Sequence, residues 1–98
     1  MRYGFFHGVE GDPAALEAAL ALLADCDRIV CLGGLLGGEG PVDGCVVARL
    51  DRLICLGGPA ERRRARDAAL PAAVRERLRA LPDATVVDGI AVMQPPRR

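Results

Sequence analysis

The sequence predicts an α/β fold, namely a βαβαβ parallel sheet with flanking helices and a C-terminal β-hairpin. The segment Arg28–Gly34 recurs almost unchanged as Arg52–Gly58, 24 residues later. This is about the period of a strand–helix–strand unit. The segment Thr85–Val92 has an Asp-Gly pair between two apolar runs, which is typical of a hairpin. The 98 residues are sufficient for one small domain, which we expect to span residues 1–98.

The first βα unit is expected at the N-terminus. Arg2–Phe6 contains Tyr and Phe residues that favour a strand. Asp12 is placed to cap a helix and Pro13 to occupy its first position, and we expect this helix to run to about Ala24. Leucines at spacings of four and three form its apolar stripe: Leu16, Leu20 and Leu23.

Two further strands are expected at Ile29–Leu32 and Leu53–Leu56, with a helix over Val42–Leu50 between them. Both strand segments are uninterrupted apolar runs, as in parallel strands that are covered on both faces. Pro71 is expected to begin a helix that carries Val74, Leu78 and Leu81 on one side. The tail 94–98 is expected to be frayed.

Composition excludes several classes of chemistry. The chain contains no Ser, Asn or Lys and only one His, and its 13 arginines balance 13 carboxylates to a net charge of 0. A serine nucleophile, a lysine Schiff base and a P-loop are therefore impossible, and a nucleic-acid partner is not expected. We find no signal peptide and no membrane segment, so a cytoplasmic location is expected. Cys31 and Cys55 lie in apolar runs and are interpreted as core residues.

Ligands of an open parallel sheet bind beyond the carboxyl ends of its strands. The candidate ligand-binding residues there are Glu10, Gly33, Gly34, Gly57 and Gly58. The glycines either cradle an anion with their backbone N–H groups or simply turn the chain. The side chains near these ends that are suited to acid–base or metal chemistry are His7, Glu10, Asp12, Glu39 and Asp43.

A run of arginines follows the third strand. It comprises Arg62, Arg63, Arg64 and Arg66. The run is either a solvated helix face or a docking patch for an acidic partner, since arginine favours ion pairs at interfaces.

Four blocks of the chain resemble those of small bacterial calcineurin-like metallophosphoesterases. Met1–Leu20 resembles the family's opening, a strand followed by a D-x-H-G-N loop (here Gly8–Asp12) and a helix, and Asp27–Leu36 resembles its second block. Leu53–Ala60 resembles the strand that precedes the GNHD block, and Leu81–Pro96 resembles the hairpin that leads into HGSP. The resemblance covers nearly the whole chain and ends about halfway through the family's usual length. It implies the N-terminal half of a two-sheet sandwich with helices outside.

The family's metal ligands are replaced in this chain. The positions that the resemblance assigns to those ligands hold Gly8, Glu10, Gly34, Gly58, Pro59 and Met93. A two-metal centre needs several ligands, including one that bridges the metals. The resemblance therefore implies that the chain is not an enzyme and has no catalytic residue, no metal ligand and no cofactor.

We predict a non-catalytic metallophosphoesterase-like protein that acts through protein contacts. Half of a sandwich leaves a sheet edge and an apolar face open, so we expect a homodimer or a protein partner that covers this edge. One alternative is a module that binds phosphate or nucleotides through the glycine-rich loops, including Gly33–Gly40. The other is a hydrolase whose rebuilt site uses His7, Glu10, Asp12 or a cysteine thiolate.

Overall fold

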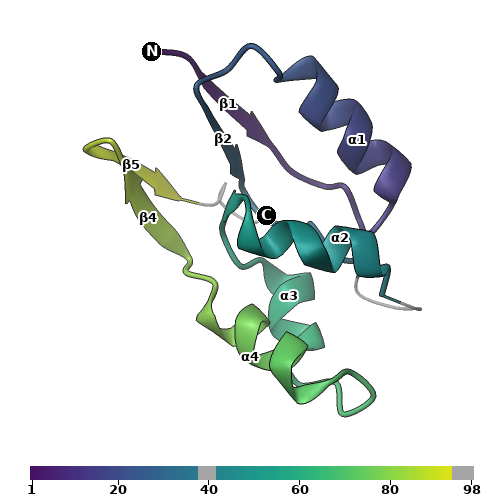
Figure 1. Cartoon of the computed structure of the whole chain (residues 1–98). Helices are drawn as coiled ribbons and strands as arrows, with labels where there is room; N and C mark the ends of the chain where they lie inside the picture. Colours follow the sequence, from purple (N-terminus) through teal and green to yellow (C-terminus); the bar gives the residue numbers. More distant parts are fainter. Residues whose placement is uncertain (38–41, 94–98) are drawn as a thin grey trace.

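A computed structural model of the chain describes residues 1–37 and 42–93. Three parallel strands form the sheet, β1 (Tyr3–Phe6), β2 (Arg28–Cys31) and β3 (Ile54–Cys55), in the order β1-β2-β3. The predicted βαβαβ architecture with a C-terminal hairpin is confirmed (Figure 1). The expectation of a frayed tail at 94–98 and part of the predicted loop Gly33–Gly40 lie outside the described residues.

The helices begin at the residues that the sequence marks as caps. Asp12 accepts a hydrogen bond from the backbone of Ala14 and starts α1 (Pro13–Leu22). Asp43 caps α2 (Gly44–Ala48), which is shorter than expected because the chain tightens into the 3₁₀ turn η1 (Arg49–Asp51).

Two more helices follow β3. They are α3 (Pro59–Arg64), which directly follows the glycines after the strand, and α4 (Ala72–Ala80), which begins after Pro71 as expected. None of the helices in the described segments has the length and apolar character needed to cross a membrane.

Alternate residues of each strand face two different cores. Phe6, Cys31 and Cys55 lie in the core formed with α1 and α2, where Leu16 and Val46 are also buried. The neighbouring residues Val30 and Leu56 are fully buried on the other face. Both faces of the central strand β2 are therefore covered at Val30 and Cys31, which explains why its sequence is apolar without alternation.

The hairpin of β4 (Ala84–Val87) and β5 (Ile90–Met93) covers the second face. Figure 1 shows it on the side of β1 and β2 that is opposite α1. Asp88 and Gly89 both have positive φ angles, +50° and +81°, as the predicted two-residue turn requires. Val87 and Val92 pack against the sheet and are only 6% and 7% exposed.

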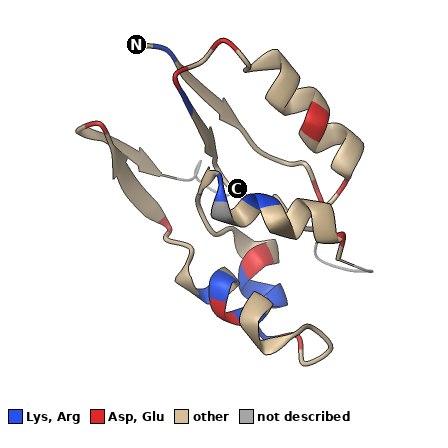
Figure 2. Cartoon of the chain, in the orientation of Figure 1, with Lys and Arg blue, Asp and Glu red and all other residues tan. Residues whose placement is uncertain are grey.

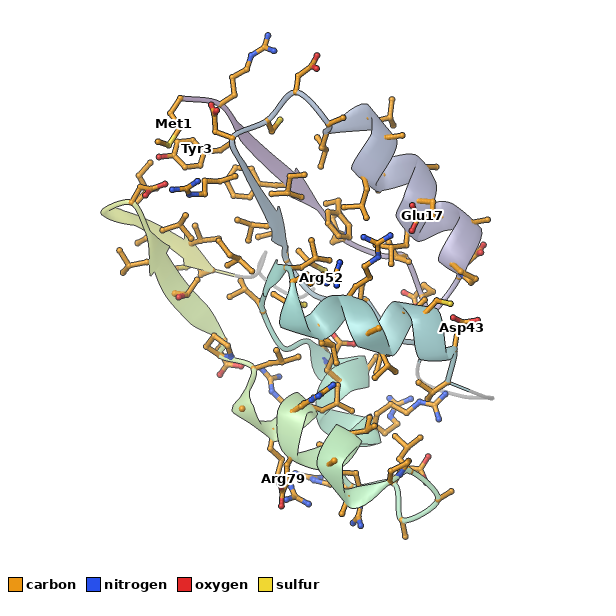
Figure 3. All side chains as sticks on the ribbon, viewed as in Figure 1. Met1, Tyr3, Glu17, Asp43, Arg52 and Arg79 are labelled. Carbon is orange, nitrogen blue, oxygen red and sulfur yellow. The ribbon has the colours of Figure 1, made fainter. Side chains whose placement is uncertain are left out.

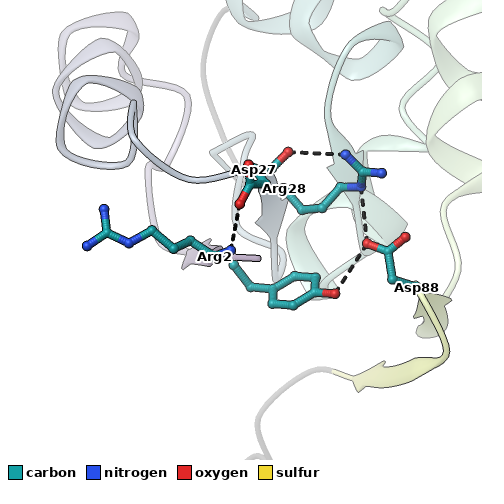
Figure 4. Close-up of polar contacts among 5 residues, drawn as sticks. Arg2, Asp27, Arg28 and Asp88 are labelled. Carbon is teal, nitrogen blue, oxygen red and sulfur yellow. Dashed lines mark hydrogen bonds and ion pairs between the residues drawn. The ribbon is translucent and has the colours of Figure 1, made fainter.

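A polar network joins the hairpin turn to the start of the sheet (Figure 4). The Tyr3 hydroxyl donates to Asp88 Oδ2 over 3.3 Å, and Arg28 Nε lies 3.2 Å from the same oxygen. Asp27 accepts from the backbone N–H of Arg2 over 2.7 Å. Partial burial and the Asp88 carboxylate raise the pKa of Tyr3 above its ordinary value.

Candidate functional site

The loops after β1 and β2 lie side by side at the carboxyl edge of the sheet. Gly8 N donates to Gly33 O over 3.3 Å, and Glu10 N donates to Gly34 O over 2.8 Å. A Cβ atom on Gly34 would lie only 3.0 Å from Gly8 N, and its φ of +69° disfavours any side chain. Glycine at position 34 therefore allows the two loops to approach each other closely.

A carboxylate from α3 lies between the loops that follow β2 and β3. Glu61 Oε1 accepts hydrogen bonds from the backbone N–H groups of Gly34, over 2.8 Å, and Gly58, over 3.1 Å. The Glu61 side chain is fully buried, and its second oxygen, Oε2, is buried without a hydrogen-bond partner among the described residues. The edge of the sheet at which parallel α/β folds bind ligands thus contains a carboxylate of the protein itself.

The same face of α3 carries a second buried charge three residues later. Arg64 Nε donates to the carbonyl oxygen of Gly37 over 2.8 Å, and Nη1 lies 3.3 Å from Asp67 Oδ2. The Arg64 side chain is 7% exposed. Because residues three apart share one helix face, Glu61 and Arg64 together attach α3 to the loop after β2.

This arrangement corrects part of the predicted arginine patch. Arg64 is buried and therefore does not belong to a solvent-facing docking surface. Arg62 forms an ion pair with Asp83 and donates to the carbonyl oxygen of Gly57 over 3.4 Å. Arg63 and Arg66 are exposed, as a docking patch requires.

The backbone N–H groups of three predicted ligand-binding glycines are engaged inside the protein. Gly34 and Gly58 donate to Glu61, and Gly57 donates to the carbonyl oxygen of Pro82 over 2.9 Å. A Cβ atom on Gly57 would also lie 3.0 Å from Leu81 Cβ. The geometry of these glycines therefore favours the interpretation in which they allow tight turns and close packing.

The predicted acid–base residues do not converge. His7 and Glu10 are exposed after β1, and the side chain of His7 has no hydrogen bond or ion pair to any residue that the structure describes. Asp12 and Asp43 cap α1 and α2 with their carboxylates. Glu39 lies outside the described residues.

The side chains at this edge do not fit the two-metal centre of the family that the sequence resembles. Within residues 1–37 and 42–93, no group of three or more His, Cys, Asp or Glu side chains is arranged to hold a metal ion. Gly34 and Gly58 occupy two of the implied ligand positions, and their N–H groups point at the Glu61 carboxylate. Such N–H groups favour an anion at this position and offer no ligand to a cation.

Glu61 is the site residue that the sequence prediction missed. Pro59 and Glu61 occupy the first and third positions of α3, and Gly58 is its N-cap. A Glu at the third position that reaches back to the N-cap N–H is typical of a helix start. This spacing predicts the bond to Gly58, whereas the bond to Gly34, 27 residues away, depends on the fold.

Cys31 and Cys55 lie in register on the neighbouring strands β2 and β3. Cys31 Sγ donates to the carbonyl oxygen of Gly33 and Cys55 Sγ to that of Leu56, each over 3.6 Å. The neighbouring Cys55 thiol lowers the pKa of Cys31 and the Cys31 thiol raises the pKa of Cys55, while burial raises the pKa of both. The nearby Glu61 carboxylate acts in the same direction as burial. Both are buried free thiols, as predicted, and Cys55 in particular is held in its unreactive, protonated form.

No family model matches the chain, and no curated protein matches it. Among solved structures, the chain is similar to the crystal structure of a metallophosphoesterase from Sphaerobacter thermophilus, with a TM-score of 0.68 and 25% sequence identity. The fold is metallophosphoesterase-like. The match covers 89% of this chain and 44% of the other, so the chain spans less than half of that enzyme's length. The predicted resemblance is thereby confirmed at the level of the fold.

Proposed function

We propose that this chain is a non-catalytic protein on a metallophosphoesterase-like fold that acts through contacts with another protein surface. The position of Glu61 is the main support for this proposal. Its buried carboxylate binds the N–H groups of Gly34 and Gly58 at the sheet edge where the fold's metal ligands are implied. A site that already holds an internal anion favours a structural role for this edge.

The hairpin supplies the proposed contact surface. Its outer face carries Val86 and Met93, which are 68% and 65% exposed, together with the exposed Ala84 and Ala91. A two-stranded ribbon that is apolar on both faces is typical of one covered by another layer. We propose that this layer is a second copy of the chain or a protein partner.

The apolar surface between the hairpin and the edge strand β1 is also partly exposed. Phe5 and Ile90 are 45% and 48% exposed and border an apolar cavity of about 180 Å³ between the sheet and the hairpin.

The four cysteines of the chain are free thiols, which supports a reducing compartment such as the cytoplasm.

The non-catalytic part of the proposal is tested by an assay for phosphodiesterase activity. We expect no hydrolysis of bis(p-nitrophenyl) phosphate above the buffer rate in the presence of Mn²⁺, Fe²⁺ or Zn²⁺, and no metal in the native mass spectrum. Turnover that is lost with a chelator and in Glu10→Ala, but retained in the control Glu17→Ala on the exposed face of α1, would refute this part.

The contact surface is tested by sedimentation of two charge variants. Val86→Lys places a charge on the outer face of the hairpin, and we expect it to abolish self-association or association with a partner. The matched control is Leu22→Lys, because Leu22 is 86% exposed at the end of α1, away from the hairpin. If both variants associate like the wild type, the hairpin is not the contact surface.

A further inference from the structure

A groove of about 510 Å³ lies between α3, α4 and the segment that leads to β4. Arg62 and Arg66 contribute guanidinium groups from α3 and the turn after it, and Arg79 contributes one from α4. Leu78 and Leu81 are its buried and half-buried apolar lining. Figure 3 labels Arg79 on α4 and shows neighbouring side chains from both helices.

The positive charge of the groove is only partly compensated. Of the lining arginines, Arg62 is paired with Asp83. Arg66 and Arg79 are exposed, and neither has an ion pair with any residue in the described part of the chain. The segment 59–83 holds seven arginines and four carboxylates, so its net charge is +3 in a chain whose total is 0. Figure 2 shows these blue segments gathered on α3 and α4.

We propose that this groove binds an acidic segment of a partner protein. Arg66 and Arg79 each hold a carboxylate, and an apolar side chain between the two carboxylates packs on Leu78 and Leu81. The planar guanidinium group donates two parallel hydrogen bonds to a carboxylate, which makes arginine suited to this contact. The proposal rests on the proposed function and deepens it, because it names the chemistry of the partner.

The shape of the groove favours a peptide over a small anion. The groove is open to solvent, so a small molecule bound there would stay partly hydrated. A peptide segment continues beyond the groove and gains further contacts on the exposed faces of α3 and α4. Its bound carboxylates also relieve the repulsion among the uncompensated arginines.

Fluorescence anisotropy with a labelled peptide tests the proposal. The probe is Glu-Glu-Leu-Glu-Glu-Leu, and the control peptide has Gln in place of each Glu. At about 0.15 M salt, where long-range attraction is screened, we expect the Gln peptide to bind at least about tenfold more weakly. Arg66→Glu and Arg79→Glu should each weaken binding of the acidic peptide by about tenfold or more.

The matched control is Arg63→Glu, because Arg63 is an exposed arginine of α3 that does not line the groove. It makes the same change in net charge and should weaken binding less than about threefold. Circular dichroism confirms that each variant is folded, as expected for substitutions at exposed positions.

Three outcomes overturn the inference. The Gln peptide binds as tightly as the Glu peptide, or Arg63→Glu weakens binding as much as Arg66→Glu, or phenyl phosphate binds whereas the acidic peptide does not. None of these depends on the phosphodiesterase assay or on Val86→Lys. A failure of the groove proposal is therefore distinguishable from a failure of the proposed function.

Discussion

Burial of a carboxylate is costly unless hydrogen bonds compensate for the lost water, and Glu61 has two such bonds on one oxygen. We expect Glu61→Ala to lower the free energy of unfolding by about 3 kcal/mol, because it leaves the N–H groups of Gly34 and Gly58 unpaired around a cavity. Urea denaturation followed by circular dichroism measures this change.

The control for that variant is Glu61→Gln. The Gln side chain retains an oxygen that accepts from Gly34 and Gly58, so we expect it to cost about half as much as Glu61→Ala. Equal losses for the two variants would show that the negative charge, rather than hydrogen-bond acceptance, holds the loops together.

Substitution of two different glycines by alanine should change the stability of the protein in opposite directions. We expect Gly34→Ala to destabilise the protein by about 2 kcal/mol or more, because Gly34 has a φ of +69° and a Cβ atom there would lie 3.0 Å from Gly8 N. Gly44 begins α2, and a Cβ atom added to it would meet nothing within 4 Å, so Gly44→Ala should stabilise by about 0.5 kcal/mol. Thermal melts of the two variants should shift in opposite directions; a neutral Gly34→Ala contradicts the close approach of the loops.

At the scale of elements, the attachment of the hairpin to the sheet should weaken at alkaline pH. The folded state raises the pKa of Tyr3, so it holds the phenolic proton more tightly than the unfolded chain does. This contribution to stability is complete below the ordinary tyrosine pKa of about 10 and is lost as pH rises through the higher folded value. Above that range the phenolate faces the Asp88 carboxylate, which is 3.3 Å from the Tyr3 oxygen.

The measurement is urea denaturation of wild type and Tyr3→Phe between about pH 8 and pH 11. We expect the stability of the wild type to fall relative to Tyr3→Phe in the upper part of that range, where only the wild type has this group to titrate. Parallel curves across the whole range would contradict the role of the Tyr3 and Asp88 contact.

The strand pair β2 and β3 should protect its cysteines from thiol reagents. Cys31 and Cys55 are buried in register, whereas Cys45 is exposed on α2. We expect Ellman's reagent at about pH 8 to label Cys45 rapidly and to label the buried pair only at the rate of global unfolding. Cys45→Ala should remove the fast phase and leave the half-buried Cys26 as the thiol that reacts before unfolding; a fast phase that survives in Cys45→Ala and disappears in Cys31→Ala would show that β2 opens locally.

At the scale of the whole molecule, 98 residues give a small core, and association should add measurably to its stability. If a second copy covers the hairpin, the melting temperature should rise with protein concentration. Differential scanning fluorimetry over a hundredfold range of concentration measures this dependence, and Val86→Lys should remove it. A melting temperature that is independent of concentration in the wild type leaves a different protein as the partner.

Local signals predicted most of the fold correctly. Asp12 and Pro13 start α1, Asp88 and Gly89 form the hairpin turn, and the repeated apolar runs are parallel strands. Each of these signals acts through residues that are neighbours in the chain, because caps and turns are short-range hydrogen-bonding and φ preferences. The ends of α1 and α2 differ from prediction because packing and the 3₁₀ turn decide where a helix stops.

The chemistry of the sheet edge was predicted less completely. The glycine positions at this edge were identified from the sequence. The sequence did not indicate that the N–H groups of Gly34 and Gly58 donate to the carboxylate of Glu61, a residue of the protein itself. Arg64 was predicted with its neighbours as a surface residue, and it is buried against Gly37 O. The contacts of Glu61 with Gly34 and of Arg64 with Gly37 were missed because a charged residue in an arginine-rich run gives no local indication of which distant loop it will meet.

The sequence alone thus determined the order of the elements and the turn of the hairpin. Only the tertiary structure decided that Glu61 binds two loops, that Arg64 is buried, and that Arg66 and Arg79 line one groove. The physical reason is distance along the chain. Glu61 and Gly34 are 27 residues apart, and their contact exists only because the parallel sheet brings the ends of β2 and β3 to the same edge.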